Sequence, residues 1–358
     1  MLSPHENRIA LVRLSALGDV VATIHAAHAI RAARRDARIT WIVDPGGAEL
    51  LRGNPAIEEV RVFPRREGPG AWQRFLLDLR ARPFDVALDL HGNLRSGIAT
   101  WATGARRRLG FAPPLSREGN RFFLTDRVAP GAGSVHRRAR VDAVLAALGV
   151  PPYAGTVWLP DEPGPREEVN AFLRERHPGR WILFQPGASR LGDYKRWPEE
   201  RYVELGRRVA ASGLGVVVHG GPGEEALVAR IAGAIRARLE PGAAGTGAAP
   251  VSDKTAGWGI HHLLALLRRC AAIVCADTAP LQLADALGVP SVGIFGPKDP
   301  AVYGPAGPRS ATLYAGVPCS PCRHRLCDHR ECLMAVGVEE VERTLRRLLG
   351  GTLDSCHA

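Results

Sequence analysis

Residues 11–21 read LVRLSALGDVV, an apolar strand pattern that passes through a short turn into a helix pattern. Val20, Ile24 and Ala27 follow at i, i+4 and i+7, a spacing that turns one apolar helix face toward a sheet. Nucleotide-binding turns at this position carry the glycines of G-x-G-x-x-G, which are absent here. The turn presents Asp19 instead, either as a carboxylate that stabilises the helix start or as a group with a chemical role.

Strand-like and helical patterns alternate outward from this stretch. Apolar strand runs are RIALVRL (8–14), RITWIV (38–43) and FDVALDL (84–90), with helices expected at 19–35 and 94–102. After the proline-rich, polar stretch 159–168, the alternation resumes with WILFQ (181–185), LGVVVH (214–219), IVCA (273–276) and SVGIF (291–295). Alternation of this kind predicts βαβ units and parallel sheets, so we expect two Rossmann-like α/β domains joined by a linker.

Length and composition fit two cores. The 358 residues are 46% hydrophobic, which argues against disorder. No run of about 20 apolar residues is present, and the N-terminus lacks a signal-peptide pattern, so we expect a cytoplasmic protein. Lys and Arg number 47 against 36 for Asp and Glu, and the resulting +11 favours anionic partners. The arginine usage of a GC-rich genome explains that count equally well.

Loops that follow the strands of the second half carry polar groups suited to a nucleotide. QPGASRLGDYKRWP (185–198) offers backbone N–H groups at Gly187 and Ser189 and the charge of Lys195, although it could also be a solvated surface turn. HGGPGEE (219–225) places Glu224 where an acid accepts hydrogen bonds from ribose, or simply interacts with the helix dipole. ADTAP (276–280) sets polar residues before a helix whose free N–H groups suit a diphosphate: Asp277, Thr278 and Ala279.

SALGD, HGNLRSG, PGASRLGDYKRWP, GGPGEE, ADTAPLQLADALGVPSVGIFGPKDP and CSPCRHRLCDHREC occur in this order along the chain. Together they resemble the ADP-heptose:lipopolysaccharide heptosyltransferases, glycosyltransferase family 9, over nearly the whole chain. The cysteine-rich tail is more similar to the heptosyltransferase II branch. The resemblance implies an α/β fold of the GT-B type, with two facing Rossmann-like domains and a central cleft. It assigns residues 1–160 to acceptor binding and 161–335 to the sugar nucleotide, with a C-terminal helix in 336–358 that packs back on the N-terminal domain.

The same resemblance implies an inverting, metal-independent transfer of heptose from ADP-heptose to an inner-core lipopolysaccharide acceptor. Asp19 matches the family aspartate that accepts the hydroxyl proton, and Lys195 matches the K-x-W-P lysine that faces the leaving diphosphate. Donor contacts are expected from Gly187, Ser189, Lys195, Glu224, Asp277, Thr278 and Ala279, and acceptor contacts from Arg95, His136 and Arg140. The family pattern D-[ST]-G-x-x-H is altered at Ala279 and Gln282, which leaves the donor sugar open.

Four cysteines form C-x2-C-x4-C-x4-C near the C-terminus, at Cys319, Cys322, Cys327 and Cys332. Four thiolates can hold a structural zinc ion, and reduced thiols or an occasional disulfide are the alternatives. No cofactor is expected for the transfer itself.

The expected partners are a sugar-nucleotide donor and a lipid-linked, phosphorylated saccharide acceptor, with peripheral contact at the inner membrane. Nucleic acid is not expected, because the basic residues are dispersed and the 6% aromatic residues show no stacking arrangement. The alternatives are a GT-B transferase or epimerase for another NDP-sugar, and a non-catalytic protein that binds phosphate or nucleic acid. The sequence leaves the oligomeric state open.

Overall fold

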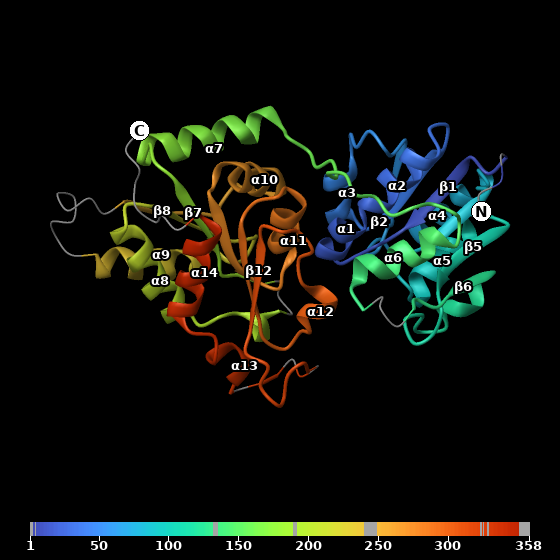
Figure 1. Cartoon of the computed structure of the whole chain (residues 1–358). Coiled ribbons are helices and arrows are strands. Elements are labelled where there is room, and N and C mark those ends of the chain that lie inside the picture. The colour runs from blue at the N-terminus through green and yellow to red at the C-terminus, as the bar shows by residue number, and fades with distance from the viewer. Residues whose placement is uncertain are drawn as a thin grey trace. The chain divides into compact units, whose positions relative to one another are not determined.

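A computed structural model of the chain describes residues 3, 5–131, 135–188, 192–239, 249–322, 324, 326–327 and 329–350. The chain divides into two compact units, Met1–Pro160 and Asp161–Ala358, each built on its own sheet. Figure 1 shows both units and labels their helices and several of their strands. Ser189 and most of the small-residue stretch 240–250 lie outside the described residues.

The first unit contains a six-stranded parallel sheet in the order β3-β2-β1-β4-β5-β6. Its strands are β1 (Arg8–Val12), β2 (Arg38–Val43), β3 (Glu59–Val62), β4 (Val86–Asp89), β5 (Arg107–Phe111) and β6 (Asp126–Val128). The central strands are buried on both faces, which is why they are apolar throughout. The strand order reverses between β1 and β4, and ligands of such sheets bind at the carboxyl ends of the strands beside that reversal.

Helices cover both faces of this sheet (Figure 1). Contacts join α1 (Leu17–Thr23) to α3 (Pro45–Leu51) and α6 (Arg137–Ala146), and α6 also contacts α2 (His25–Ala33). On the other face, α4 (Pro69–Ala81) packs beside α5 (Leu94–Ala102), and a short 3-10 helix, η1 (Asn120–Phe123), contacts α5. Apolar side chains of β1, β2 and β4 form a core with aromatic and aliphatic side chains of α4 and α5 under this second layer.

The single helix expected over 19–35 is two helices, interrupted at Ile24. Two side chains lie within hydrogen-bond distance of backbone carbonyl groups at the break. The Thr23 hydroxyl donates to the Asp19 carbonyl at 2.7 Å, and His25 Nδ1 lies 2.9 Å from the Ala22 carbonyl. Local side-chain hydrogen bonds of this kind compete with the backbone hydrogen bonds of a helix. The apolar spacing continues across the break, so the sequence pattern does not reveal it.

The second unit repeats the design with the order β12-β11-β10-β7-β8-β9. Its strands are β7 (Trp181–Gln185), β8 (Gly215–His219), β9 (Val251–Lys254), β10 (Ala272–Ala276), β11 (Ser291–Phe295) and β12 (Ser310–Tyr314). Its helices are α7 (Pro163–Arg176), α8 (Glu199–Ala211), α9 (Glu225–Arg238), α10 (Ile260–Arg269), α11 (Ala279–Ala286), α12 (Pro300–Tyr303), α13 (Glu331–Met334) and α14 (Val338–Leu348), with a 3-10 turn η2 (Asp193–Lys195).

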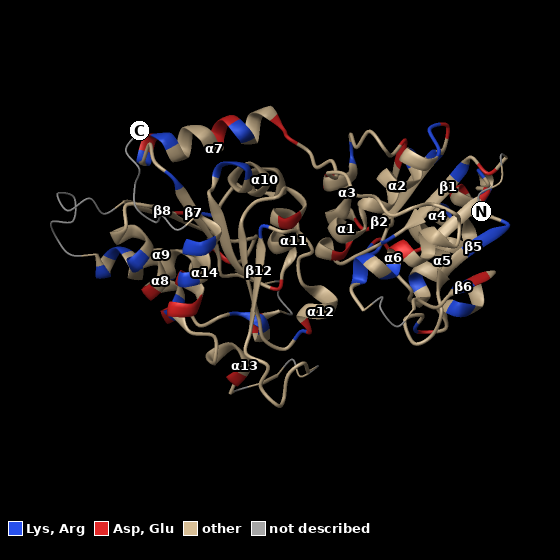
Figure 2. Ribbon diagram, viewed as in Figure 1, with Lys and Arg blue, Asp and Glu red and all other residues tan. Residues whose placement is uncertain are grey.

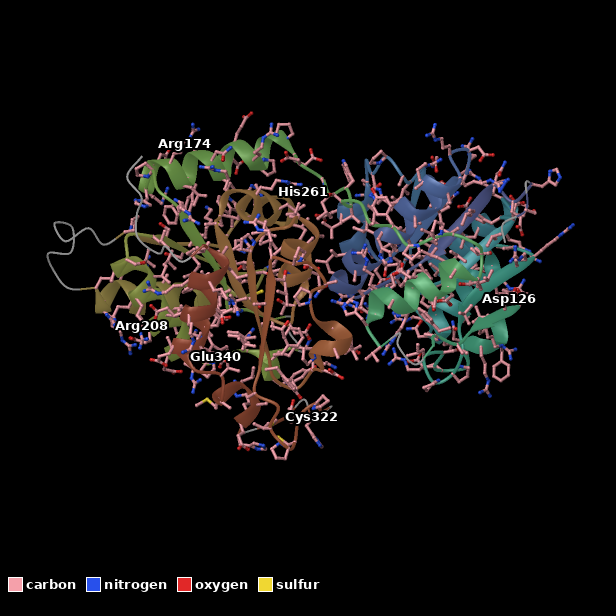
Figure 3. All side chains as sticks on the ribbon, in the orientation of Figure 1. Asp126, Arg174, Arg208, His261, Cys322 and Glu340 are labelled. Atoms are coloured by element: carbon pink, nitrogen blue, oxygen red, sulfur yellow. The ribbon has the colours of Figure 1, made fainter. Side chains whose placement is uncertain are left out.

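The C-terminal helix α14 packs on α8, β11 and β12 of the second unit, and its expected packing on the N-terminal domain remains a prediction. Val338, Val341 and Leu345 lie in the second unit's core. Arg208 of α8 pairs with two glutamates of α14, at 2.7 Å from Glu339 and 3.1 Å from Glu342. Both helices carry acidic residues in their first turn and basic residues in their last turn, coloured red and blue in Figure 2, and Figure 3 labels Arg208. The apolar stripe of α14 thus completes the core of its own unit.

Among the residues that the structure describes, none of the helices combines the length and apolar character needed to cross a bilayer.

Candidate active site

Asp19 lies in the first turn of α1, directly after β1, where it is held by two guanidinium groups. Oδ2 is 2.8 Å from Nη2 of Arg13, and Oδ1 is 3.0 Å from Nη1 of Arg137 on α6. Burial alone would raise the pKa of this carboxyl, but the charges and hydrogen bonds of the two arginines outweigh it and lower the pKa below its usual range. The side chain keeps 26% of its surface exposed, so a charged carboxylate remains accessible to a ligand.

The HGNLRSG segment forms a turn around Asp89, the last residue of β4. Asp89 is fully buried and accepts hydrogen bonds from the backbone N–H groups of His91 at 3.0 Å and Gly92 at 2.9 Å, and from the Asn120 amide at 2.6 Å. Gly92 has φ +83°, and a Cβ there would lie 2.9 Å from the Leu115 carbonyl oxygen. Only glycine fits this turn without strain.

The turn delivers Arg95 to the carboxyl edge of the sheet. Asn93 caps α5 by accepting from the Ser96 N–H at 3.0 Å, which fixes where the helix begins. Burial, together with the charges of Arg13 and Arg95, lowers the pKa of His91 to about 3, so this imidazole is neutral at physiological pH. Among the described residues, Arg95 has no carboxylate within ion-pair distance, which leaves its guanidinium able to bind an anion.

Asp44 follows β2 at the same edge and was not anticipated from the sequence. Its Oδ2 is 3.0 Å from Arg65 Nη1, while Oδ1 is buried without a hydrogen-bond partner among the described residues. Burial raises the pKa of Asp44 despite the opposing charges of Arg65 and Arg95. Asp44 follows β2, His91 follows β4 and Arg95 lies in the first turn of α5, so these groups share the polar carboxyl edge of the sheet.

Arg140 lies in α6 and His136 directly precedes that helix, and the acceptor contacts expected of both remain predictions. His136 is the N-cap of α6, where Nδ1 accepts from the Arg138 N–H at 3.3 Å. The residue of α6 that reaches Asp19 is Arg137, between them. The sequence reasoning passed over both Arg13 and Arg137, although Arg13 directly follows a strand, the position at which ligand-binding groups gather in such sheets.

In the second unit, Lys195 of η2 meets Asp277 at the end of β10. Nζ lies 2.7 Å from the Asp277 carboxylate and 3.1 Å from the Asp277 carbonyl oxygen. Thr278 donates its hydroxyl to the Ala276 carbonyl at 3.2 Å, and Ala279 begins α11. A cation, a carboxylate and the free N–H groups at the start of α11 therefore lie together, and the diphosphate site expected here remains a prediction.

Glu224 packs against glycines from two loops. Oε2 accepts from the Gly221 N–H at 2.8 Å, and Oε1 is 3.5 Å from Nη2 of Arg196. A Cβ on Gly187 would stand 1.9 Å from Oε2, so the loops after β7 and β8 touch here. Burial raises the pKa of Glu224 although the Gly221 N–H and Arg196 favour its charged form. A partly buried acid beside a glycine turn is suited to accept hydroxyl hydrogen bonds.

The structure also describes Ala279 and Gln282, the two positions that depart from the family pattern. Gln282 is buried and its amide donates to the Tyr303 carbonyl at 3.1 Å, so it ties α11 to α12. Ala279 occupies the first position of α11.

The cysteine segment packs on the loop after β11. A Cβ on Gly296 would lie 3.0 Å from Cys332 Sγ, and Cys322 N–H donates to the Pro297 carbonyl at 2.9 Å. Figure 3 labels Cys322 on the loop that leads to α13. Burial and the nearby charges of the other three thiols raise the pKa of Cys332. The described ligand atoms that lie within 4.8 Å of one another are a different set from the four cysteines expected: Cys319, His329 and Glu331.

Comparisons with known proteins agree on one family. Residues 72–333 match the model of glycosyltransferase family 9 (heptosyltransferase). Lipopolysaccharide heptosyltransferase 1 of Pseudomonas aeruginosa (strain PAO1) is 30% identical over 338 residues, which cover 90% of this chain and 88% of that protein.

Two solved structures share the fold. The structure of E. coli ADP-heptose lps heptosyltransferase II has a TM-score of 0.74 at 21% identity, covering 96% of this chain and 98% of that one. E. coli heptosyltransferase WaaC with ADP has a TM-score of 0.72 at 21% identity, covering 95% and 99%. The two parallel six-stranded sheets with flanking helices match these structures, and the expected GT-B fold is confirmed.

Proposed function

Because the chain belongs to glycosyltransferase family 9, the heptosyltransferases, we propose that it transfers a heptose from ADP-heptose to an inner-core lipopolysaccharide acceptor. The observation that carries the proposal is the accessible Asp19 carboxylate, kept ionised by Arg13 and Arg137 at the carboxyl edge of the first sheet. Its chemistry matches the proton acceptor that such a transfer requires.

The proposed reaction is a single displacement with inversion at the anomeric carbon. An acceptor hydroxyl loses its proton to Asp19 as its oxygen bonds to C1 of the heptose. The bond from C1 to the diphosphate oxygen breaks, and ADP leaves with the electron pair. Asp19 is a weaker base than an ordinary carboxylate because its pKa is lowered, so the proton transfer should accompany the attack and not precede it.

The second unit would stabilise the charge that develops on the leaving ADP. Lys195 and the N–H groups at the start of α11 supply preorganised positive charge, which makes a metal ion unnecessary in this proposal. Gly187 permits close approach of the backbone, and Glu224 would accept hydrogen bonds from the ribose. Asp277 orients Lys195 beside the donor sugar.

The acceptor is proposed to be a lipid-linked, phosphorylated saccharide that binds the first unit. Arg95 offers a guanidinium suited to phosphate oxygens, with His136 and Arg140 as further contacts. Such an acceptor would bring the protein to the cytoplasmic side of the inner membrane as a peripheral enzyme. The +11 charge would favour that association.

A structural zinc ion at the cysteine segment is proposed as a separate feature. The thiols of Cys332 and its three neighbours influence one another electrostatically, and Cys319 lies with His329 and Glu331 inside one possible coordination sphere. Sulfur and imidazole donors of this kind suit zinc. The ion would fix the loop and take no part in the transfer.

A different sugar nucleotide is the second candidate, favoured by Ala279 and Gln282. Gln282 lacks the titratable group of the family pattern, and its amide donates a hydrogen bond to the Tyr303 carbonyl. Nucleotide and sugar specificity must therefore be measured together.

The function is tested by thermal shift with ADP, UDP, GDP and CDP, followed by mass spectrometry of transfer products. We expect preferential stabilisation by ADP and a product heavier than the acceptor by one heptose unit. Asp19→Asn should lower turnover by about 10²-fold or more with ADP binding retained. Asp126→Asn, on the exposed edge strand β6 and labelled in Figure 3, is the matched control. Retained turnover in Asp19→Asn would exclude Asp19 as the base, and stabilisation by another nucleotide would exclude the ADP donor.

A further inference from the structure

A groove of about 840 Å³ opens in the first unit between α4 and α5. Its floor and walls are aromatic and aliphatic: Trp72, Leu76 and Leu77 of α4 and Trp101 of α5. Trp72 is fixed in place by an edge-on contact with Phe63, with the ring centroids 4.7 Å apart. One wall of the groove therefore rests on packed aromatic side chains.

Two large apolar side chains of the groove are open to solvent. Leu77 is 62% exposed and Trp101 is 52% exposed. Single exposed apolar residues are ordinary, but a leucine and a tryptophan that line one groove form a contiguous apolar surface, which marks a binding face. The groove plays no part in the proposed transfer.

The rim of the groove is cationic. Arg65, Arg66 and Arg80 line it, and no carboxylate does among the described residues. Arg80 lies over the ring of Trp101, with its guanidinium carbon 5.6 Å from the ring centroid. An apolar trough bordered by guanidinium groups complements an anionic amphiphile, whose chain enters the trough while its charge meets the rim.

The groove also connects to the polar edge of the sheet. Arg65 lines the groove and pairs with Asp44, 3.0 Å away, at the carboxyl end of β2. From Pro69 to Arg80 the groove follows about three turns of α4. One end thus begins at the edge that carries Asp44 and Arg95, where a lipid-linked acceptor would place its saccharide.

We propose that this groove is the membrane-docking surface, which binds the headgroup and acyl region of anionic phospholipid in the bilayer. The inference rests on the proposed function in that the bilayer is where a lipid-linked acceptor resides. Tryptophan is favoured at a membrane interface because its ring is apolar and its N–H remains hydrated. Arginines add attraction to acidic headgroups. A protein partner would not require a rim whose charged side chains are all arginines.

The test uses the full chain and vesicles of phosphatidylcholine with or without phosphatidylglycerol, followed by co-sedimentation. We expect binding to anionic vesicles that weakens with salt. Leu77→Asp should lower the partition coefficient about tenfold, because a leucine is lost from the apolar contact. Arg80→Ala should lower it about fivefold. Phe122→Asp is the matched control, since Phe122 is 73% exposed in the same unit but does not line the groove.

Fluorescence quenching by phospholipids brominated on the acyl chain locates the contact. Quenching in the wild type should decrease in Trp101→Phe and remain in Phe122→Asp. The far-UV circular dichroism spectrum and the melting temperature of every variant should equal those of the wild type, which shows that the fold is intact. Because these readouts need no acceptor, failure to observe heptose transfer would count against the proposed function and leave the docking result standing.

Three outcomes would overturn the docking proposal. In the first, the wild type does not bind anionic vesicles. In the second, Leu77→Asp and Phe122→Asp bind them equally well. Alternatively, light scattering could show a dimer that Leu77→Asp dissociates, which would make the groove an interface between two copies of the chain.

Discussion

Gly187 lies so close to Glu224 that a Cβ on the glycine would stand 1.9 Å from Oε2 of the glutamate. The two residues come from the loops after β7 and β8, adjacent strands of the second sheet. Glycine is needed here for the space that it leaves to a carboxylate, since Gly187 has no positive φ. The position of Glu224 therefore depends on the loop after β7.

Gly187→Ala should displace Glu224 and weaken ADP binding about tenfold or more, because one well-placed hydrogen-bonded group is lost. Isothermal titration calorimetry measures the change. Gly233→Ala on α9 is the control, because no atom lies within 4 Å of a Cβ there, and the alanine should stabilise the helix by about 0.5–1 kcal/mol. Unchanged ADP affinity in Gly187→Ala would mean that Glu224 does not contact the donor.

Arg137→Gln should move the acid limb of the pH profile of kcat/KM to higher pH. Arg137 favours the charged form of Asp19, so its loss raises the pKa of that carboxyl, and the base becomes protonated at a higher pH than in the wild type. Arg138→Gln is the neighbouring control, since Arg138 bonds to the Tyr153 carbonyl at 2.8 Å. An acid limb that does not move would show that the limb belongs to another group.

Lys195→Met should lower kcat/KM about 10²-fold, because a preorganised cation is lost from the leaving group and Asp277 keeps a charge without its partner. Asp277→Asn in the same background removes that stranded charge. The double variant should therefore lose less donor affinity than the sum of the two single losses, as a double-mutant cycle of binding free energies measures. Strict additivity would indicate that the two side chains act independently in the donor complex.

Metal content should follow the cysteine segment. The protein purified without chelator should contain about one zinc ion per chain, by elemental mass spectrometry. Cys319→Ser should lose most of that metal and melt at a lower temperature, because Cys319 lies with His329 and Glu331 in one possible coordination sphere. Cys270→Ser should keep it, since Cys270 is buried at the end of α10, away from the segment. Wild-type protein without bound metal would refute the zinc proposal and leave the transfer mechanism untouched.

The alternation of apolar strands and helices predicted both Rossmann-like sheets, because buried parallel strands must be apolar and their crossovers helical. Local motifs also located Lys195, Asp277 and Glu224, whose loops each follow a strand. The break at Ile24 was missed because Thr23 and His25 take helix carbonyls without disturbing the apolar period. The apolar spacing of residues 19–35 does not reveal such side-chain hydrogen bonds.

Partners distant along the chain were the main omission at the site. Arg137 is 118 residues from Asp19, and nothing in the spacing of either motif relates them. The elements that α14 packs against could not be predicted for a similar reason, since an amphipathic helix shows which face it buries but not which surface covers it. Contacts of this kind depend on how α6 and α14 pack against other elements, and a single sequence does not supply that arrangement.

Leu345→Ala should destabilise the second unit by about 3 kcal/mol, because the side chain is fully buried in the core between α14 and the sheet. Urea unfolding followed by tryptophan fluorescence measures the loss. Arg347→Ala, exposed on the same helix, should change the free energy of unfolding by less than about 0.5 kcal/mol.

The same helix bears on how the chain folds during synthesis. The whole first unit has been translated by Pro160, so that unit can fold while the remainder is still being made. The second unit cannot finish its core until Leu345 has emerged from the ribosome, and until then its sheet exposes the apolar face that α14 covers. Nascent chains stalled before that residue should depend on chaperones far more than chains stalled just after the first unit.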